Sequence, residues 1–302
     1  MAYTCFDCPR NCGAVRNEYS GDGFCAGGTK IPVAKVMTHL WEEPVLAKDN
    51  GTSNIFLYGC NLRCRFCQNS KINGSALDYD KKKLEYYDNT AFSELLLKLN
   101  DAPTNNVGIV SGDHYIRQIA GAITENVKKS LTKPIIFNGN GYNKPELLSL
   151  LEGKIDIFMP DLKFSSGAVS DAYCAAPDYP DYAKAAVKKM FEMTGPVEFT
   201  PDGLLKKGVI IRHLIMPSRL RETFAVLDFI NENFPKDGVI VSLMSQYTPM
   251  DNPENKPFPE LSRPITAYEK EKAIRYLDNC ENITLAFTQE DGVVSESFIP
   301  DF

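Results

Sequence analysis

Three cysteines stand close together in the run Gly59–Asn69, with the spacing C-x3-C-x2-C at Cys60, Cys64 and Cys67. A cubane [4Fe–4S] cluster is normally held by four cysteine thiolates. Three thiolates on one short loop would therefore leave one iron for a ligand that the protein does not supply. The alternative is a structural zinc loop with a fourth ligand elsewhere, although tetrahedral zinc sites more usually contain spaced C-x2-C pairs. We interpret the triad as a [4Fe–4S] site with one open iron.

This loop closely resembles the cluster loop of the radical S-adenosylmethionine (SAM) enzymes. Phe66, an aromatic residue directly before the third cysteine, completes the signature of that superfamily. The resemblance implies that the open iron takes the amino and carboxylate groups of SAM. It also implies that reduction cleaves SAM to a 5′-deoxyadenosyl radical, which abstracts a hydrogen atom from a substrate.

A second cysteine set lies near the start of the chain. Cys5, Cys8, Cys12 and Cys25 follow the spacing C-x2-C-x3-C-x12-C. Four thiolates so close together suit one tetrahedral metal, and zinc is the common structural choice. A single rubredoxin-like iron or an auxiliary iron–sulfur cluster uses the same ligands. The spacing predicts a metal site without choosing among zinc, iron and a second cluster.

The remaining cysteines and the histidines are isolated in the sequence. Cys280 lies in a predicted helix, which favours core packing, whereas Cys174 lies in an insertion and is a candidate substrate-side residue. His39 comes shortly before the only tryptophan and is either close to a metal or structural. His114 and His213 follow or end predicted strands, so both a site role and a structural role are open.

Composition limits the classes of function. The chain has 302 residues, a net charge of −6 and no block rich in Lys or Arg. Nucleic acid is not an expected partner, because neutralisation of phosphates dominates such binding. We find no secretory signal at the start and no apolar run near the ~20 residues that span a bilayer. Nine cysteines without an export signal indicate metal ligands rather than disulfides. We therefore expect a cytoplasmic metalloprotein from a reducing, low-oxygen environment, without membrane contact.

From residue 54 onward, short apolar runs alternate with amphipathic segments. Six strands are predicted at residues 54–58, 107–110, 134–137, 155–159, 209–216 and 239–244. Helices are predicted around Phe92 to Leu99 with Asn89 or Thr90 as cap, along Ile116 to Val127, from near Asn143, from Tyr182 to Met193, from Phe224 to Ile230, and after a capping box formed by Thr266 and Glu269. Such alternation implies a parallel sheet with right-handed crossovers.

Six strand–helix units predict an α/β fold, a partial (β/α)6 TIM-like barrel with a small N-terminal metal-binding extension. We expect the extension at residues 1–50 and the barrel at 51–248. Residues 249–302 would add a C-terminal helix and a strand near 283–287 that close the barrel. An insertion at about residues 165–207 interrupts the regular alternation.

Polar residues collect at the ends of the predicted strands, which is where barrel enzymes place their chemistry. The candidates are Ser111, Gly112 and Asp113 after the second strand, Asn138, Asn140 and Gly141 after the third, Asp161 and Lys163 after the fourth, Arg212 and His213 in the fifth, and residues 242–247 at the sixth. The simpler readings are a turn at the third strand and a structural ion pair between Arg212 and Asp161. A buried arginine needs an anion in either case.

Several segments together resemble a narrower family, the uncharacterised radical SAM proteins related to pyruvate formate-lyase activating enzyme. These segments are Cys5 to Gly27, Leu40 to Pro44, Cys60 to Asn69, Met159 to Lys163, Ile211 to Leu214 and Leu243 to Tyr247. By analogy with the activating enzymes, the turn from Asn138 to Gly141 would contact SAM together with Asp161, Lys163 and Arg212. Residues 111–114 resemble the Gly-Gly-Glu-Pro element that binds the SAM amino group, with a serine and a histidine in place of a glycine and the proline.

We therefore expect a radical SAM oxidoreductase that receives its electron from flavodoxin or ferredoxin. The leading hypothesis is activation of a glycyl radical enzyme, in which a loop of the partner protein enters the open barrel. The alternative is modification of a small metabolite or peptide, with the 165–207 insertion closing the site. A broad entrance would favour the first and an enclosed pocket the second. A non-catalytic zinc-binding scaffold is the alternative from a different class of protein.

Overall fold

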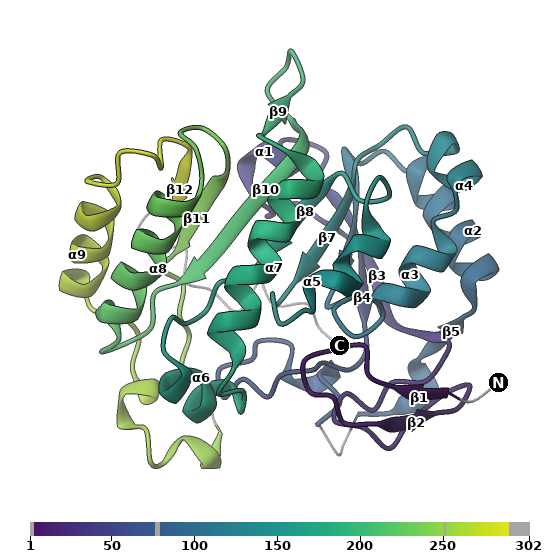
Figure 1. The fold of residues 1–302 in the computed structure, drawn as a ribbon, viewed down its shortest axis with the longest axis horizontal. Helices are drawn as coiled ribbons and strands as arrows, with labels where there is room; N and C mark the ends of the chain where they lie inside the picture. The colour runs from purple at the N-terminus through teal and green to yellow at the C-terminus, as the bar shows by residue number, and fades with distance from the viewer. Residues whose placement is uncertain (1–2, 76–78, 251, 290–302) are drawn as a thin grey trace.

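The computed structural model describes residues 3–75, 79–250 and 252–289. Its centre is a curved, mostly parallel sheet (Figure 1). The parallel strands at its centre are β4 (Thr52–Leu57), β6 (Asn106–Val110), β7 (Ile135–Gly139), β8 (Ile157–Pro160), β10 (Leu205–Leu214) and β11 (Ile240–Met244). They neighbour one another in chain order, and each pairs in parallel with the next.

Four further strands complete the described sheet. They are β3 (Ile31–His39), β5 (Glu85–Tyr87), β9 (Glu198–Phe199) and β12 (Ala286–Thr288). Strand β3 runs antiparallel between β4 and β5, whereas β12 pairs in parallel with β11. The strand order therefore ends in β12 on one side and β5 on the other, and these two do not pair in the described part of the chain. The sheet is an open partial barrel, which confirms the predicted fold class.

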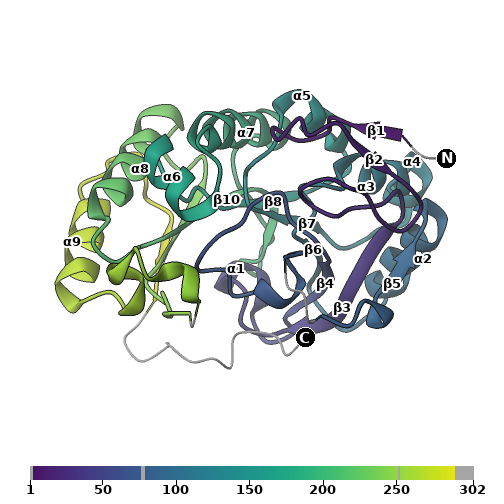
Figure 2. The same ribbon diagram turned by 90° about the horizontal axis from the view of Figure 1, so that it is seen from below.

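Helices cover the convex side of the sheet (Figure 2). They are α2 (Asn89–Asn100), α3 (Ile116–Ala122), α4 (Glu125–Ser130), α5 (Pro145–Leu148), α6 (Gly167–Cys174), α7 (Tyr179–Thr194), α8 (Leu220–Asn233) and α9 (Ala267–Leu277), with a short α1 (Pro44–Ala47) after β3. Short 3-10 helices lie at Ser70–Ile72, Lys81–Lys83, Ser149–Leu151, Pro253–Asn255 and Pro259–Ser262. None of the helices in the described ranges is long and apolar enough to cross a membrane.

The central strands are apolar because their side chains are covered on both faces. Ile109, Phe137, Phe158 and Ile211 are each completely buried. Continuous runs of β-branched and aromatic residues of this kind are typical of parallel strands beneath crossover helices. This packing holds the strands in place, so their carboxyl ends meet at one edge of the sheet.

Three helices differ from the sequence-based expectation. The cap of α2 is Asp88, whose carboxylate accepts a hydrogen bond from the Ala91 N–H at 2.9 Å, rather than Asn89 or Thr90. The predicted helix from Ile116 to Val127 is two helices, because the Thr124 side chain caps α4 and Ile123 leaves helical geometry. Helix α6 was not predicted. The capping box of Thr266 and Glu269 is confirmed at the start of α9.

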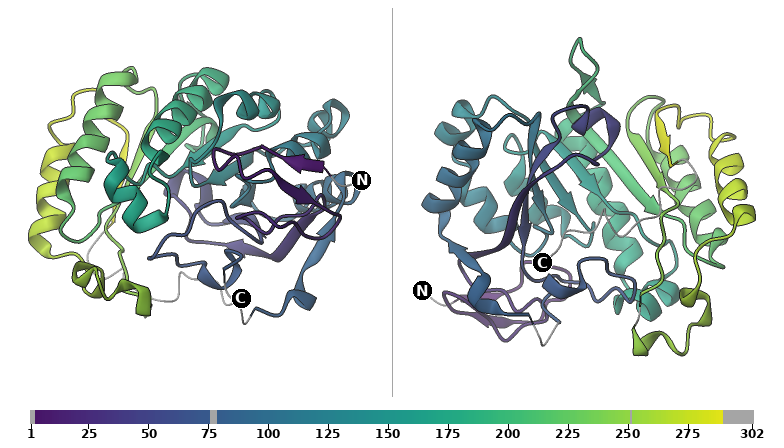
Figure 3. Two further views of the ribbon diagram at one scale, coloured as in Figure 1. Left: turned by 60° about the horizontal axis from the view of Figure 1, so that its bottom comes forward. Right: turned by 180° about the vertical axis from the view of Figure 1, so that it is seen from behind.

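The N-terminal residues form a hairpin of β1 (Tyr3–Cys5) and β2 (Ala14–Arg16), which lies beside the lower edge of the sheet in Figure 1 and in the right panel of Figure 3. Within the expected extension, β3 is an integral strand of the main sheet, since it pairs with β4 from Val33 to His39. The division at residue 50 remains a prediction. Of the expected C-terminal segment, residues 251 and 290–302 lie outside the described residues.

Candidate active site

A cavity of about 810 Å³ opens at the carboxyl ends of the parallel strands. Its wall includes residues from β4, β6, β7, β10 and β11 and from the segment just after β8, together with residues 39–44, 47–49 and 287–289. Ligand pockets typically have volumes of roughly 300 to 1,000 Å³. This cavity is at the upper end of that range, and it collects the polar strand ends that the sequence analysis identified.

The cluster loop follows β4 directly and places Cys60, Cys64 and Cys67 in the wall of this cavity. The end of α6 holds the loop through two backbone hydrogen bonds. Arg63 N–H donates to Cys174 O at 3.1 Å, and Arg65 N–H donates to Tyr173 O at 2.9 Å. Cys174 is completely buried, so it lies behind the loop rather than on a substrate side. The loop is therefore anchored from both the sheet and the insertion.

Phe66 is largely buried between the cluster loop and the barrel wall. Its ring packs edge-on against Phe164, with 6.1 Å between ring centroids, and lies near Tyr247. It also belongs to the cavity wall. The aromatic position of the loop thus fixes the direction of the neighbouring cysteines.

Sulfur at the cluster loop receives hydrogen bonds from the protein. Cys60 Sγ accepts from the Leu62 N–H and from Asn140 Nδ2, each at 3.4 Å. Burial raises the pKa of the Cys67 thiol to about 12, and a hydrogen bond with Cys174 lowers the pKa of the Cys64 thiol. Hydrogen bonds to sulfur and burial are two of the factors that set the potential of an iron–sulfur cluster.

These donors fit a [4Fe–4S] cluster, since three thiols of one loop face one cavity and N–H groups already point at sulfur. In the described part of the chain, no group of three or more His, Cys, Asp or Glu side chains is arranged to hold a single metal ion. A cubane does not require such a group, because each of its cysteine ligands binds a different iron. The assignment of the three cysteines as its ligands stays a prediction.

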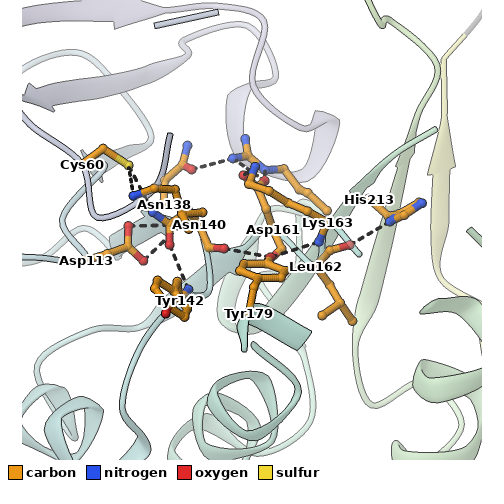
Figure 4. A network of polar contacts seen from close by, with 12 residues as sticks. Cys60, Asp113, Asn138, Asn140, Tyr142, Asp161, Leu162, Lys163, Tyr179 and His213 are labelled. Atoms are coloured by element: carbon orange, nitrogen blue, oxygen red, sulfur yellow. Dashed lines mark hydrogen bonds and ion pairs between the residues drawn. The ribbon is translucent and has the colours of Figure 1, made fainter. Parts of the chain in front are cut away.

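A charged network joins three strand ends (Figure 4). Asp161 pairs with Lys163 Nζ at 2.6 Å and with Arg212 Nε at 3.0 Å, and Arg212 Nη2 also donates to Asn138 Oδ1 at 2.7 Å. Burial alone would raise the pKa of the Asp161 carboxyl, but the two cations outweigh it and lower that pKa. The expected ion pair exists, with two cations on one carboxylate, and Glu42 and Glu43 of the same cavity wall also interact electrostatically with Arg212.

The turn from Asn138 to Gly141 packs directly on the end of β8. Gly141 has a φ of +78°, and a Cβ atom there would lie 2.6 Å from Asp161 O, so no other residue fits. The Tyr179 hydroxyl accepts from the Lys163 N–H at 3.0 Å and lies 2.8 Å from Asp161 O and 3.0 Å from Asn140 O. Sequence reasoning missed Tyr179, because it lies on α7, away from every strand end.

Four predicted SAM-contact residues are outside the cavity wall, namely Gly112, Asp113, Gly141 and His213. Asp113 accepts from the Asn140 N–H at 3.1 Å through both oxygens, and burial raises the pKa of its carboxyl to about 6. The His213 ring contacts Leu162 O at 2.7 Å and Thr223 Oγ1 at 3.0 Å, far from Cys60 in Figure 4. The side chains of Asp113 and His213 therefore support the strand ends from outside the cavity.

Other predicted residues do reach the wall. They are Ser111, Asn138, Asn140, Asp161, Lys163 and Arg212. Ser111 adopts a left-handed φ of +61°, which turns the chain sharply after β6. His114 points elsewhere, because its ring contacts Tyr58 O at 3.1 Å.

The segment between β3 and α1 forms a part of the wall that sequence reasoning did not assign. Leu40 and Trp41 line the cavity while remaining 52% and 69% exposed. Glu42 Oε1 accepts from Asn54 Nδ2 at 2.8 Å, and burial raises the pKa of the Glu43 carboxyl despite its hydrogen bond with Ser242. A tryptophan followed by two carboxylates was the available signal, but no periodicity connected it with the barrel.

The family comparison agrees with this geometry. A model of the radical SAM superfamily matches residues 54–213, more than half of the chain. The uncharacterized protein MJ0674 of Methanocaldococcus jannaschii is 30% identical over 281 residues, covering 89% of this chain and 73% of that protein.

Two solved structures share the fold. SuiB of Streptococcus suis bound to its precursor peptide SuiA has a TM-score of 0.50 and 14% identity over 81% of this chain. A mutant of spore photoproduct lyase has a TM-score of 0.54 and 12% identity over 85% of this chain and 79% of its own. This chain spans about half the length of SuiB, 50% of it. Because the family model matches more than half of its residues, the chain belongs to the radical SAM superfamily.

Proposed function

We propose that Cys60, Cys64 and Cys67 bind the [4Fe–4S] cluster of this radical SAM enzyme, and that its radical activates a glycyl radical enzyme. The observation that carries the first part is the position of all three cysteines in the wall of one large cavity. When bound, the cluster would pass an electron to SAM and so generate a 5′-deoxyadenosyl radical for hydrogen abstraction. Flavodoxin or ferredoxin is the proposed source of that electron.

The residues of the cavity wall would hold SAM by its charged ends. Lys163 and Arg212 share the carboxylate of Asp161, and the N–H groups that this ion pair leaves over suit the carboxylate of SAM. Asn138 and Asn140 add amide groups at the neighbouring strand end. Buried polar groups of this kind orient a ligand and exclude water from the reacting atoms.

Exposed side chains in the wall of the cavity favour a polypeptide substrate. Leu40 and Trp41 are exposed there, and exposed aromatic side chains beside a pocket are typical anchors for protein partners. The cavity volume of about 810 Å³ can accommodate SAM together with a short loop of a partner. These two features support glycyl radical activation and the activating-enzyme-related branch.

A small metabolite or peptide remains the second candidate, and a different observation favours it. Glu42, Glu43, Gln246 and Gln289 place carboxylate and amide groups in the same cavity wall. Such groups could hydrogen-bond the polar atoms of a small substrate. A non-catalytic zinc scaffold would have no use for this cavity.

Formation of 5′-deoxyadenosine tests the cluster assignment. The protein is reconstituted anaerobically with iron and sulfide, reduced, and supplied with SAM. We expect 5′-deoxyadenosine from the native chain and from Cys280→Ala, whose cysteine lies away from the cavity, but none above background from Cys64→Ala. Cleavage retained in Cys64→Ala would refute the ligand assignment, and no cleavage by the native chain with cluster and SAM bound would refute the enzyme proposal.

The acceptor of the radical is tested separately. Purified pyruvate formate-lyase serves as the probe, and the glycyl radical is detected by electron paramagnetic resonance. A glycyl signal that depends on SAM and on Cys64 supports activation. Normal SAM cleavage without any such signal contradicts activation of that probe and favours the small-substrate alternative.

We also propose that the N-terminal cysteines bind a metal, as zinc, iron or a second cluster. Cys5, Cys8, Cys12 and Cys25 are brought together at a separate, much smaller cavity. Their number and chemistry support this proposal.

A further inference from the structure

The four N-terminal cysteines surround a space of about 10 Å³, room for roughly one water-sized atom. Cys5, Cys8 and Cys25 are buried, and Cys12 is exposed at its edge. Arg10 and Arg16 complete the wall of the same space. A single ion suits this volume better than a cubane cluster, although the thiol side chains would need to rotate toward it, since they are not arranged around a metal position here.

Arg16 on β2 is the most unusual member of this group. The residue is 1% exposed, and its guanidinium has no hydrogen bond or ion pair with a carboxylate among the described residues. Nη1 donates to His114 O at 3.0 Å and Gly28 O at 3.5 Å, and Nη2 donates to Cys25 Sγ at 3.4 Å. Within the described ranges, Nε has no hydrogen-bond partner. The Tyr115 ring lies 5.3 Å away, which stabilises a cation without neutralising it.

The nearest acidic candidate is already engaged. Asp7 pairs with Arg117 Nη2 at 2.9 Å and accepts from the Tyr3 hydroxyl at 2.9 Å. An arginine remains protonated in proteins, and a buried charge without a counter-charge is strongly destabilising. Asp7 also interacts with Arg16 at longer range, but its single charge is already paired with Arg117, so further negative charge would come from the cysteine side of Arg16.

We propose that Cys5, Cys8, Cys12 and Cys25 bind one divalent metal ion, zinc or iron, as thiolates, and that Arg16 is the counter-cation of this centre. Four thiolates around a divalent ion carry a net charge of about −2, and their four protons pass to solvent on binding. No electron is transferred in this step. The metal centre deepens the proposed function. It rests on that function only for the role of the neighbouring cluster loop.

The centre stands directly against that loop. Arg10 Nε donates to Asn61 O at 2.9 Å, and Arg63 donates to both Cys60 O and Phe24 O. A Cβ atom at Gly59 would lie 2.5 Å from Cys25 O, so the two segments touch at their backbones. Metal binding would therefore also hold the loop that carries Cys60 in position.

Metal content of a cluster-free variant tests the centre independently of SAM chemistry. The full chain carrying Cys60→Ala, Cys64→Ala and Cys67→Ala is purified anaerobically, and its metals are measured by mass spectrometry. We expect about one zinc or iron per chain, lost when Cys5→Ser and Cys8→Ser are added and retained with Cys280→Ser. No bound metal, or several irons with the spectrum of a cluster, would overturn the proposal.

Arg16→Met tests the counter-cation role in the same cluster-free chain. We expect its metal affinity in chelator competition to fall roughly ten- to a hundred-fold, whereas Arg16→Lys keeps most of the affinity. The melting temperatures of both forms are also compared. Arg16→Met should lower that of the metal-bound chain and leave or raise that of the metal-free chain, where the arginine has no counter-charge. Equal losses in both forms, or unchanged affinity, would show that Arg16 is only structural.

Discussion

At the scale of single residues, the main charged feature of the cavity wall is one carboxylate that is paired with two cations. Asp161 holds Lys163 and Arg212 together, and the lowered pKa of its carboxyl keeps it ionised at neutral pH. Each cation retains hydrogen-bonding capacity beyond this one carboxylate. The same three residues can therefore be a structural ion network and a binding site for an anionic ligand group.

Arg212→Met should weaken SAM binding because it removes one of the two cations while leaving Asp161 paired with Lys163. Loss of a hydrogen bond to a charged group predicts a roughly ten- to hundred-fold higher dissociation constant for SAM. Equilibrium dialysis of the cluster-loaded protein measures it, with iron content as the check on folding. Arg212→Lys keeps the charge but loses the planar guanidinium. Its dissociation constant for SAM should therefore lie between those of the native chain and of Arg212→Met. An unchanged constant would remove Arg212 from the SAM site.

At the scale of elements, the turn and helix ends are secured by side chains that reach back to the backbone. Glu269 accepts from Thr266 N–H at 2.8 Å and Ser218 N–H at 2.6 Å, and it pairs with Arg263. It thereby joins the start of α9 to the loop before α8. The sequence signal for the capping box was local, but the bonds to Ser218 and Arg263 were not part of it.

Acidification should expose this contribution of Glu269. Its hydrogen bond with Arg263 lowers the pKa of the carboxyl from 4.5 to about 2. Because the pKa in the folded state is the lower one, the stabilisation is complete above pH 4.5 and is lost as the pH falls toward 2. Urea unfolding between pH 7 and pH 3 should therefore show a smaller loss on acidification for Glu269→Gln than for the native chain.

Glu271→Gln is the matched control, since Glu271 lies on the same helix in an exposed pair with Arg275. Exposed pairs of this kind contribute about 0.3 to 0.5 kcal/mol. At pH 7 we expect Glu269→Gln to cost about 1 to 2 kcal/mol, within the range for a lost cap. Equal behaviour of the two variants across this pH range would contradict the assignment.

At the scale of the whole molecule, the barrel is open between β5 and β12, and the cavity extends from the cluster loop to residues 287–289. Leu40 and Trp41 belong to its wall and are exposed. A partner protein at this cavity could therefore contact these two side chains. Under the proposed function, recognition of a partner and cleavage of SAM would depend on different parts of one cavity.

Trp41→Ala should separate recognition of a partner from cleavage of SAM. With the probe polypeptide, we expect glycyl radical formation to fall about ten-fold or more, because loss of an aromatic anchor typically costs 2 kcal/mol or more. SAM cleavage without the polypeptide should change little. Tyr268→Ala, at an exposed aromatic residue of α9 away from the cavity, is the control. An equal effect of both substitutions would exclude a specific docking role for Trp41.

Sequence alone determined the features whose parts are neighbours in the chain. The C-x3-C-x2-C loop, the alternation of strands and helices, and the capping box of Thr266 and Glu269 depend on spacing along one segment. The break between α3 and α4 was missed although it is local, because the apolar spacing continues across the cap at Thr124.

Tertiary structure alone decided what meets across segments. It joined Arg212, Asp161 and Asn138 from three strands, turned His213 toward Thr223, and brought Tyr179 of α7 under the strand ends. It also placed Arg16 against His114 and the segment of Trp41 at the cavity. These contacts depend on the register of the sheet and on helix packing, which bring together residues far apart in the chain and leave no periodic signal along it.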